Sequence, residues 1–206
     1  AAAGEAGRSV WIAKSTDNGA SFATEADALS KATGACGCCG LNAFVGPDTT
    51  LRVLYRTATD SATRDMVLLE SSDNGARFVA RTAAPWRINK CVMSSAAFTA
   101  NGSRVIGAWE SKGQVAWQRL DVDGSTAISA PGKSSKRKLP SVAVNAKGYT
   151  LMAWSEGSGW NRAGVATWQL FAPGGSPIPG TAGKRNDSPV WSFPATAVRA
   201  SGDFVV

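Results

Sequence analysis

The four cysteines are the side chains whose type and spacing point most directly to chemistry. Cys36, Cys38 and Cys39 fall close together, and Cys91 lies further along the chain. In an exported protein an even number of cysteines indicates disulfides, and Cys91 could pair with any of the other three. Thiolates together with the thioether of Met93 would instead suit Cu(I), and thiolates alone would suit zinc. The sequence therefore leaves two interpretations open, a disulfide framework and a copper or zinc site.

Histidine is absent from the chain. This excludes a histidine base, a histidine metal ligand and a c-type haem, which needs the histidine of C-x-x-C-H. Any catalysis must therefore use carboxylates, tyrosine, serine, lysine, arginine or the cysteines.

Carboxyl groups at a shared pocket would suit glycoside hydrolysis, which needs a proton donor and a nucleophile or base. Glu110 and Glu156 end two equivalent predicted strands and point toward the same end of the fold. The candidate catalytic residues are Tyr55, Asp65, Glu110 and Glu156. The candidate ligand-binding residues are Arg56, Arg64, Trp160 and Arg162. The alternative is that these charged side chains form ordinary ion pairs or anchor loops.

The elements that must position these side chains are predicted to be short strands. The 206 residues include 22 glycines and 9 prolines, spaced so closely that long helices are disfavoured. Hydrophobic residues make up 44% of the chain, which argues against disorder. No apolar run reaches the roughly 20 residues that a membrane-spanning helix needs. The predicted class is all-β.

A strand–turn–strand unit recurs along the chain, which indicates a repeat architecture. Its three clearest copies align without gaps, and each is an alternating run closed by a glycine; they begin at Ser95, Ser141 and Ala195. A fainter copy covers residues 41–45. Each copy leads into a second apolar run, which predicts four hairpins whose second strands cover 51–56, 104–110, 150–156 and 203–206.

A second hairpin unit alternates with the first, and its two best copies have matching turns. Each turn carries serine, aspartate and glycine at fixed spacing and ends in phenylalanine. The two sets are Ser15, Asp17, Gly19 and Phe22, and Ser71, Asp73, Gly75 and Phe78. The polar side chains can hydrogen-bond the backbone of the turn, the glycine accepts a positive φ, and the phenylalanine is expected to pack the hairpin against the core.

These two turns resemble the Asp box, S-x-D-x-G-x-[ST]-[FW], of the sialidase-like (BNR-repeat) β-propellers, although Arg77 stands at the Ser/Thr place of the second copy. Further segments look like a bacterial, extracytoplasmic subgroup often labelled exo-α-sialidase: Gly37-Cys-Cys, Arg64-Asp-Met66, Cys91-Val-Met-Ser-Ser95 and Glu156-Gly-Ser-Gly-Trp160. The resemblance implies a single sialidase-like β-propeller domain over residues 1–206, built from four-stranded antiparallel blades. It also implies that the Asp boxes are structural.

The order of the hairpins allows two kinds of propeller. Four blades could close if the strand at 9–14 lay beside the strand at 203–206 in one blade. Alternatively, the chain is part of a six-bladed propeller, the usual size in sialidases.

In such blades the connections between blades and the loops between second and third strands emerge at one end. We call this the loop end; it comprises residues 23–40, 57–64, 81–93, 111–113, 130–140, 157–163 and 181–193. It holds all four cysteines, the basic run from Lys133 to Lys138, and three tryptophans, Trp86, Trp160 and Trp191. The Asp-box turns fall at the opposite end. Because binding residues concentrate on loops carried by a rigid scaffold, the loop end is the predicted site.

The expected function is binding of an acidic glycan, or a similar small acidic ligand, by a secreted or periplasmic sialidase-like propeller. The net charge of +7 favours acidic partners, but no aromatic residue interleaves the basic run, so nucleic acid is not expected. Known sialidases use an arginine triad and a tyrosine–glutamate pair; this chain has no R-I-P segment and only two tyrosines, Tyr55 and Tyr149. Turnover is therefore not expected. Two alternatives stay open: an exo-α-sialidase-type glycoside hydrolase, and a soft-metal protein that binds copper through the cysteines.

Overall fold

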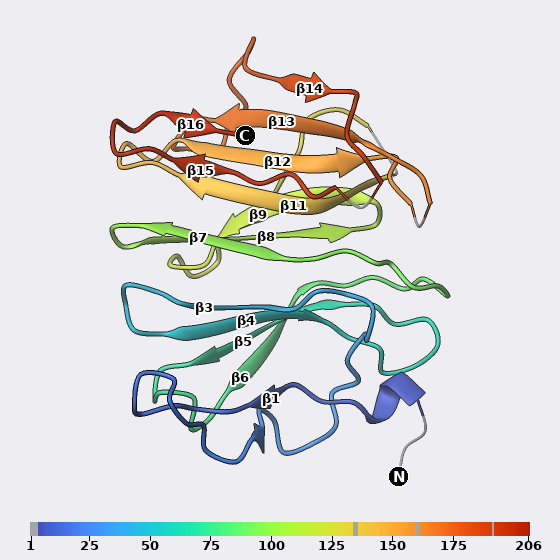
Figure 1. Ribbon diagram of the computed structural model, residues 1–206, viewed down its shortest axis with the longest axis vertical. Coiled ribbons are helices and arrows are strands. Elements are labelled where there is room, and N and C mark those ends of the chain that lie inside the picture. The colour runs from blue at the N-terminus through green and yellow to red at the C-terminus, as the bar shows by residue number, and fades with distance from the viewer. Residues whose placement is uncertain (1–3, 134–135, 160, 191) are drawn as a thin grey trace.

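The computed structural model describes residues 4–133, 136–159, 161–190 and 192–206. Its regular structure is β-strand apart from one short 3-10 turn, η1 (Gly4–Gly7). Three four-stranded antiparallel sheets lie one above another, and a two-stranded pair accompanies each end of the chain (Figure 1). The all-β prediction is confirmed.

Each four-stranded sheet is formed by consecutive strands in sequence order. The first contains β3 (Asn42–Val45), β4 (Leu51–Arg56), β5 (Met66–Ser71) and β6 (Val79–Ala84). The second contains β7 (Ala97–Asn101), β8 (Arg104–Ser111), β9 (Gln114–Arg119) and β10 (Ile128–Ser129). The third contains β11 (Arg137–Val144), β12 (Thr150–Glu156), β13 (Val165–Phe171) and β14 (Gly183–Arg185).

The second strand of each sheet is buried along almost its whole length, because other layers cover both of its faces. β4, β8 and β12 accordingly read as nearly continuous apolar runs rather than as alternating ones. The predicted bounds of these three strands agree with the structure to within one residue. β6, the last strand of the first sheet, is mostly exposed.

The core consists of three apolar clusters, one on each side of the second sheet and one outside the first. Between the second and third sheets, Trp117 meets Phe171 edge to face, with ring centroids 5.7 Å apart. Between the first and second sheets, Leu54 and Leu68 pack with Trp109. The third cluster lies between the first sheet and the N-terminal segment and includes Tyr55.

The predicted pairing of the terminal strands is wrong. β1 (Trp11–Ile12) pairs with β2 (Ala26–Asp27), and β15 (Ala197–Val198) pairs with β16 (Phe204–Val205). The two pairs lie at opposite ends of the stack in Figure 1. β15 lies against the third sheet, where the Thr196 N–H donates to Ser141 Oγ at 3.0 Å. The segment around β1 instead packs against the first sheet through Val10. The described sheets therefore form an open stack rather than four closed blades.

Hydrogen bonding within the two serine–aspartate turns follows the expectation. Ser15 Oγ donates to Asp17 Oδ1 at 2.7 Å, and the Ser21 N–H donates to the same oxygen at 2.9 Å. In the second turn Ser71 Oγ donates to Asp73 Oδ1 at 2.8 Å and accepts the Gly75 N–H at 2.9 Å. Both glycines have a positive φ.

The phenylalanines that end these turns behave differently from each other. Phe78 packs against the cluster that contains Tyr55, as expected. Phe22 is 65% exposed, so its predicted packing against the core is wrong. The first turn belongs to the N-terminal segment, where the only strands among the described residues are the two-residue pair β1 and β2. Such a short pair offers little apolar surface for Phe22 to cover.

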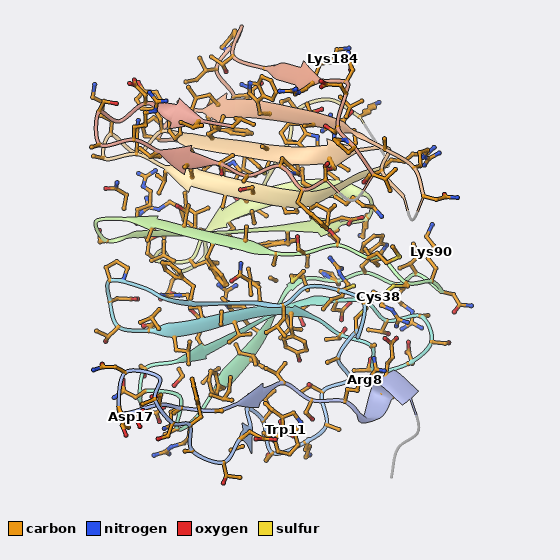
Figure 2. The ribbon with its side chains drawn as sticks, viewed as in Figure 1. Arg8, Trp11, Asp17, Cys38, Lys90 and Lys184 are labelled. Carbon is orange, nitrogen blue, oxygen red and sulfur yellow. A yellow bond between two sulfur atoms is a disulfide. The ribbon has the colours of Figure 1, made fainter. Side chains whose placement is uncertain are left out.

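The two ends of the strands carry different side chains, as the sequence predicted. Figure 2 shows Asp17 on the left side of the molecule and Cys38 and Lys90 on the right side. The cysteines and the serine–aspartate turns are thus separated by the length of the strands.

Candidate functional site: a basic cavity beside a sulfur cluster

A cavity of about 510 Å³ opens at the loop end, a size within the range of small-molecule sites. Its lining comes from the connection that precedes β7, the end of β8 with the following turn, the start of β11, and the loop after β12. The lining residues are Trp86, Ile88, Lys90, Cys91, Val92, Met93, Glu110, Lys112, Gly113, Lys136, Lys138, Ser158, Gly159 and Arg162. We call this the basic cavity.

Positive charge dominates the basic cavity. The basic side chains are Lys90, Lys112, Lys136, Lys138 and Arg162. Among the lining residues that the structure describes, Glu110 is the only carboxylic acid. Lys138 Nζ donates to the Val92 carbonyl at 3.1 Å, which ties the start of β11 to the cysteine-bearing connection. The cavity is therefore suited to an anionic ligand.

The turn between β8 and β9 brings Lys112 to the cavity. Ser111 pairs with Gln114, so the hairpin has a two-residue loop. Both loop residues, Lys112 and Gly113, have a positive φ, of 56° and 73°, which is the conformation of a type I′ turn. The Gly113 carbonyl then accepts the Arg137 N–H at 2.9 Å, which fixes the turn against β11.

Glu110 is a buried carboxyl group at the end of β8. Only 3% of its surface is exposed, and its Oε2 atom has no hydrogen-bond partner in the described structure. Burial raises the pKa of Glu110 to about 7, against the opposing effects of a Ser94 hydrogen bond and the positive charges of Arg56 and Lys138. This carboxyl group therefore changes charge near neutral pH inside a cavity of opposite sign.

Arg56 lies behind the cavity wall and holds three loops together. Its Nη1 donates to the Arg64 carbonyl at 2.7 Å, and its Nη2 donates to the Glu110 carbonyl at 2.6 Å. Its guanidinium lies over the ring of Trp86, 5.2 Å from the centroid, which is a cation–π contact. The Trp86 N–H in turn donates to Asp65 Oδ1 at 2.7 Å. Arg56 thus supports the wall but does not line the cavity.

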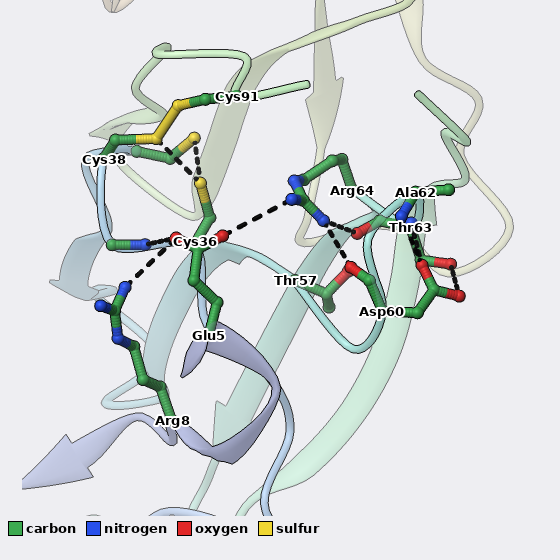
Figure 3. A network of polar contacts seen from close by, with 12 residues as sticks. Glu5, Arg8, Cys36, Cys38, Thr57, Asp60, Ala62, Thr63, Arg64 and Cys91 are labelled. Carbon is green, nitrogen blue, oxygen red and sulfur yellow. Dashed lines mark hydrogen bonds and ion pairs between the residues drawn. A yellow bond between two sulfur atoms is a disulfide. The ribbon is translucent and has the colours of Figure 1, made fainter. Parts of the chain in front are cut away.

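The four cysteines come together beside the cavity. Cys38 and Cys91 form a disulfide, which confirms the predicted use of cysteines in a disulfide and selects Cys38 as the partner. Cys36 and Cys39 keep free thiols. The Sγ atom of Cys36 lies 2.8 Å from that of Cys39 and 3.3 Å from that of Cys38 (Figure 3).

The pKa values of the two free thiols are shifted in opposite directions. The hydrogen bond from Cys36 lowers the pKa of Cys39, with help from the backbone N–H groups of Met93 and Ser94 and from the charge of Arg56. The same hydrogen bond, together with burial, raises the pKa of Cys36. The contact between the two sulfurs therefore favours a proton on Cys36 and negative charge on Cys39.

A network from the N-terminal turn holds the cysteine loop in place. Glu5 Oε1 accepts the Gly37 N–H at 2.8 Å, and its Oε2 lies 3.5 Å from Nη2 of Arg64 (Figure 3). Arg8 Nη1 donates to the same carboxylate at 3.2 Å. The position of the C-x-C-C loop is thus fixed by a residue some 30 positions earlier in the chain.

The structure brings some of the predicted site residues to the cavity and places others elsewhere. Glu110, Cys91, Met93 and Arg162 line it. Tyr55 is buried among apolar side chains under the first sheet, where burial raises its pKa. Trp160 lies outside the described residues.

Three of the charged candidates are engaged in contacts of their own. Glu156 Oε1 accepts a hydrogen bond from Arg137 at 2.6 Å, and Asp65 anchors the Trp86 backbone. Arg64 is bound to the carbonyls of its own loop and to Glu5. These contacts correspond to the ion-pair and loop-anchoring alternative.

The lysines of the cavity were not predicted as ligand contacts. Lys136 and Lys138 belong to the basic run that was placed at the loop end without a ligand assigned to it. Lys90 and Lys112 lie in segments of the loop end, and this position was the sequence feature that could have indicated their role in the cavity. The Ser94 side chain hydrogen-bonds Glu110, and the Ser94 carbonyl accepts the Gly40 N–H at 3.1 Å. Its nearness to Cys91 was the only sequence signal for Ser94.

The fold is similar to that of solved sialidases. A variant of the NanB sialidase from Streptococcus pneumoniae matches 94% of this chain with a TM-score of 0.62, and a leech intramolecular trans-sialidase matches 94% with a TM-score of 0.53; both are 14% identical in sequence. A protein of unknown function from Dyadobacter fermentans matches 90% of the chain, with a TM-score of 0.53 and 14% identity. The chain spans 31% and 32% of the two sialidases and 55% of the Dyadobacter protein. These likenesses show a sialidase-like fold.

No protein-family model and no curated protein sequence matches the chain. Among the described residues, none of the helical segments has the length and apolar character needed to cross a membrane.

Proposed function

We propose that the protein is an extracytoplasmic, sialidase-like propeller domain that binds an acidic glycan in the basic cavity. The observation that carries the proposal is the cavity itself, which is lined by five basic side chains and by one buried carboxyl group of raised pKa. A sugar carboxylate would be held by charge-assisted hydrogen bonds from the lysines and Arg162. Carbohydrate is the ligand class because the structural neighbours with known activities are sialidases.

The proposal is binding rather than hydrolysis. Of the candidate catalytic residues Tyr55, Asp65, Glu110 and Glu156, only Glu110 lines the basic cavity of the described chain. A glycosidase of either stereochemical class needs a second carboxyl group or a nucleophile across the scissile bond. The separation of the candidates supports a binding site, and an exo-α-sialidase-type hydrolase stays the alternative.

Three four-stranded antiparallel sheets, each with its strands in sequence order, support the proposal that the sheets are propeller blades. With four-blade closure excluded, membership of a six-bladed propeller stays a prediction. The disulfide between Cys38 and Cys91 supports an oxidising, secreted or periplasmic location.

A copper or zinc site also stays a prediction. The sulfur atoms of Cys36, Cys38 and Cys91 all lie within 4.8 Å of one another. Two of these sulfurs are joined in the disulfide, so a soft cation would have the thiolates of Cys36 and Cys39 as its ligands. The cation would lie close to Arg56, which carries a charge of the same sign. Met93 lines the adjacent cavity and would have to supply any third sulfur.

Calorimetric titration with sialyllactose, and with lactose as the neutral control, tests the proposed ligand class. We expect sialyllactose to bind more tightly than lactose, since only the first carries a carboxylate. Lys112→Glu should weaken the binding of sialyllactose about fivefold or more, because it reverses a charge at the cavity.

Lys147→Glu is the matched control. It makes the same charge change on an exposed residue of the β11–β12 turn, at the other end of the strands. Equal binding of the two sugars, or equal losses in the two variants, would count against a specific anionic site. Release of sialic acid from sialyllactose during the titration would favour the hydrolase alternative.

A further inference from the structure

The four sulfur atoms form a row of successive contacts that runs from the half-buried Cys39, through the buried Cys36, to an exposed disulfide. Cys39 Sγ is 2.8 Å from Cys36 Sγ, Cys36 Sγ is 3.3 Å from Cys38 Sγ, and Cys38 is bonded to Cys91 (Figure 3). The separation of Cys36 Sγ from Cys38 Sγ falls within the roughly 3–3.5 Å at which reacting atoms are poised for attack. The arrangement is more than a structural disulfide requires, because a disulfide alone does not need two further sulfurs beside it.

We propose that the cluster is a thiol–disulfide exchange site, in which the Cys36/Cys39 dithiol and the Cys38–Cys91 disulfide interconvert. In the first step the sulfur of Cys36 attacks Sγ of Cys38; a Cys36–Cys38 bond forms and the Cys38–Cys91 bond breaks, so that Cys91 leaves as a thiolate. The proton of Cys36 passes to the neighbouring thiolate of Cys39 as Cys36 attacks.

In the second step Cys39, once deprotonated, attacks Sγ of Cys36, and Cys38 leaves as a thiolate. Its proton goes to Cys38 or Cys91 through solvent. The result is a Cys36–Cys39 disulfide and a Cys38/Cys91 dithiol. Two thiols and one disulfide are present before and after, so the rearrangement needs no external oxidant or reductant.

The surroundings of the row fit this exchange. Cys36 is only 7% exposed, so external reagents reach it poorly, whereas Cys38 and Cys91 are exposed. Cys39 is half-buried and in contact with Cys36, so it lies behind the attacking sulfur. The Cys36/Cys39 pair would thus store two reducing equivalents that the exchange delivers to the surface.

The outer end of the row fits reaction with a second molecule. Cys91 lines the basic cavity, beside Lys90 and Met93. When Cys38 and Cys91 are reduced, they can exchange with an external disulfide RSSR, which re-forms the Cys38–Cys91 bond and releases two RSH. The positive surroundings favour disulfides that carry carboxylates, such as oxidised glutathione. This inference is independent of glycan binding.

Peptide mapping can follow the exchange, because trypsin separates the cysteines. Cleavage after Lys31 and Arg52 leaves the first three cysteines in peptide 32–52, and cleavage after Lys90 and Arg104 leaves Cys91 in peptide 91–104. While Cys91 is bonded to Cys38 the two peptides stay linked. Either exchange step frees peptide 91–104, so maleimide labelling of this peptide measures the exchange directly.

The experiment uses the full chain with one disulfide and two thiols, incubated anaerobically at pH 8 and then trapped with N-ethylmaleimide. We expect labelled peptide 91–104 while the chain still holds two thiols, at a level about tenfold or more above that in Cys36→Ser, which lacks the central sulfur. Cys39→Ser should still allow the first step and so should label Cys91. Trapping at pH 5 should reduce the labelling of Cys91 in the wild type more than it reduces the labelling of cysteines in the unfolded, reduced chain, because exchange adds a second thiolate-dependent step to the alkylation.

Two results would overturn the exchange site. The first is wild-type protein in which Cys36 and Cys39 are labelled while Cys91 stays linked at both pH values. The second is protection of Cys36 and Cys39 that is relieved only when a Cu(I) chelator removes metal, since that would assign the pair to a metal. The labelling of Cys91 in wild-type protein at the two pH values tests the exchange even if neither serine variant folds.

Discussion

At the scale of single residues, the unusual group is Glu110. Its carboxyl is buried at the end of β8, and the groups that act on it are Ser94, Arg56, Lys138 and Cys39. Burial outweighs the positive neighbours, so the neutral acid is favoured up to about pH 7. While Glu110 is neutral, it does not offset the positive charge of the basic side chains in the cavity, as an ionised carboxylate would.

The raised pKa of Glu110 makes a stability prediction with a definite sign. Between its ordinary value of 4.5 and about 7 the folded chain holds a proton that the unfolded chain has lost, so the free energy of unfolding falls as pH rises through this window. The loss should be on the order of 3 kcal/mol at most. Glu110→Gln should therefore be more stable than the wild type at pH 8 and show little difference at pH 4.5, as measured by urea unfolding at both pH values.

Glu156→Gln is the control for this experiment. The carboxylate of Glu156 accepts hydrogen bonds from Arg137 and from the Trp154 indole at 2.9 Å, so its loss should destabilise the protein. A Glu110→Gln variant that is less stable than the wild type at pH 8 would show that the ionised carboxylate is well satisfied and the pKa is not raised.

Only part of the site could be predicted from residue types. Glu110 and the cysteines were predictable, because their positions at strand ends and in connections follow from the repeat. Tyr55 was misleading, since its side chain faces the opposite side of β4 from Leu54, under the first sheet. The lysines of the cavity carry no motif, and their convergence depends on how four separate segments are folded.

At the scale of elements, the turns are stabilised by local side chains. Ser71 is 2% exposed, and its hydroxyl links the Gly75 N–H to Asp73. Ser15 makes the same pair of bonds in the first turn but is less buried. Matching sequences therefore form matching turns in different surroundings.

The different burial of the two serines predicts different costs for the same change. Ser71→Ala should lower the free energy of unfolding by about 1–2 kcal/mol, because it removes a buried hydroxyl and leaves the half-buried Gly75 N–H without its partner. Ser15→Ala should cost less, since water can replace the hydroxyl. Urea unfolding of the two variants tests this, and affinity for sialyllactose should be unchanged in both. A larger loss in Ser15→Ala would contradict the structural account of the turns.

Strand positions were predictable at this scale because periodicity and glycine turns are local signals. β4 and β12 have the predicted bounds, and β8 ends one residue later than predicted. The packing of Phe22 was not predictable, because it depends on how much apolar surface the neighbouring strands offer.

At the scale of the whole molecule, three long sheets are stacked and a short pair is attached at either end (Figure 1). The predicted pairing of the terminal strands failed because the repeat specifies which strands form a hairpin but not which hairpins meet. β15 instead contacts β11, and β1 pairs only with β2.

The stack predicts an uneven pattern of hydrogen exchange. Amides in β4, β8 and β12 are bonded in the middle of four-stranded sheets and buried, so they should exchange only on global unfolding. Amides in β1 and β16 belong to two-residue pairs and should exchange much faster, by local opening. Mass spectrometry of exchange in the native protein measures this; equal protection of the terminal pairs would contradict the open stack.

The central claim, that an acidic ligand binds in the basic cavity, is tested most directly by mapping a sialyllactose titration onto the backbone amide spectrum. We expect the resonances of Met93, Lys112 and Gly113 at the loop end to shift in a saturable way, with lactose producing no such shifts. Gly19 and Gly75, in the turns at the opposite end, should not respond. Shifts centred on those turns, or no shifts at millimolar sialyllactose, would contradict the claim.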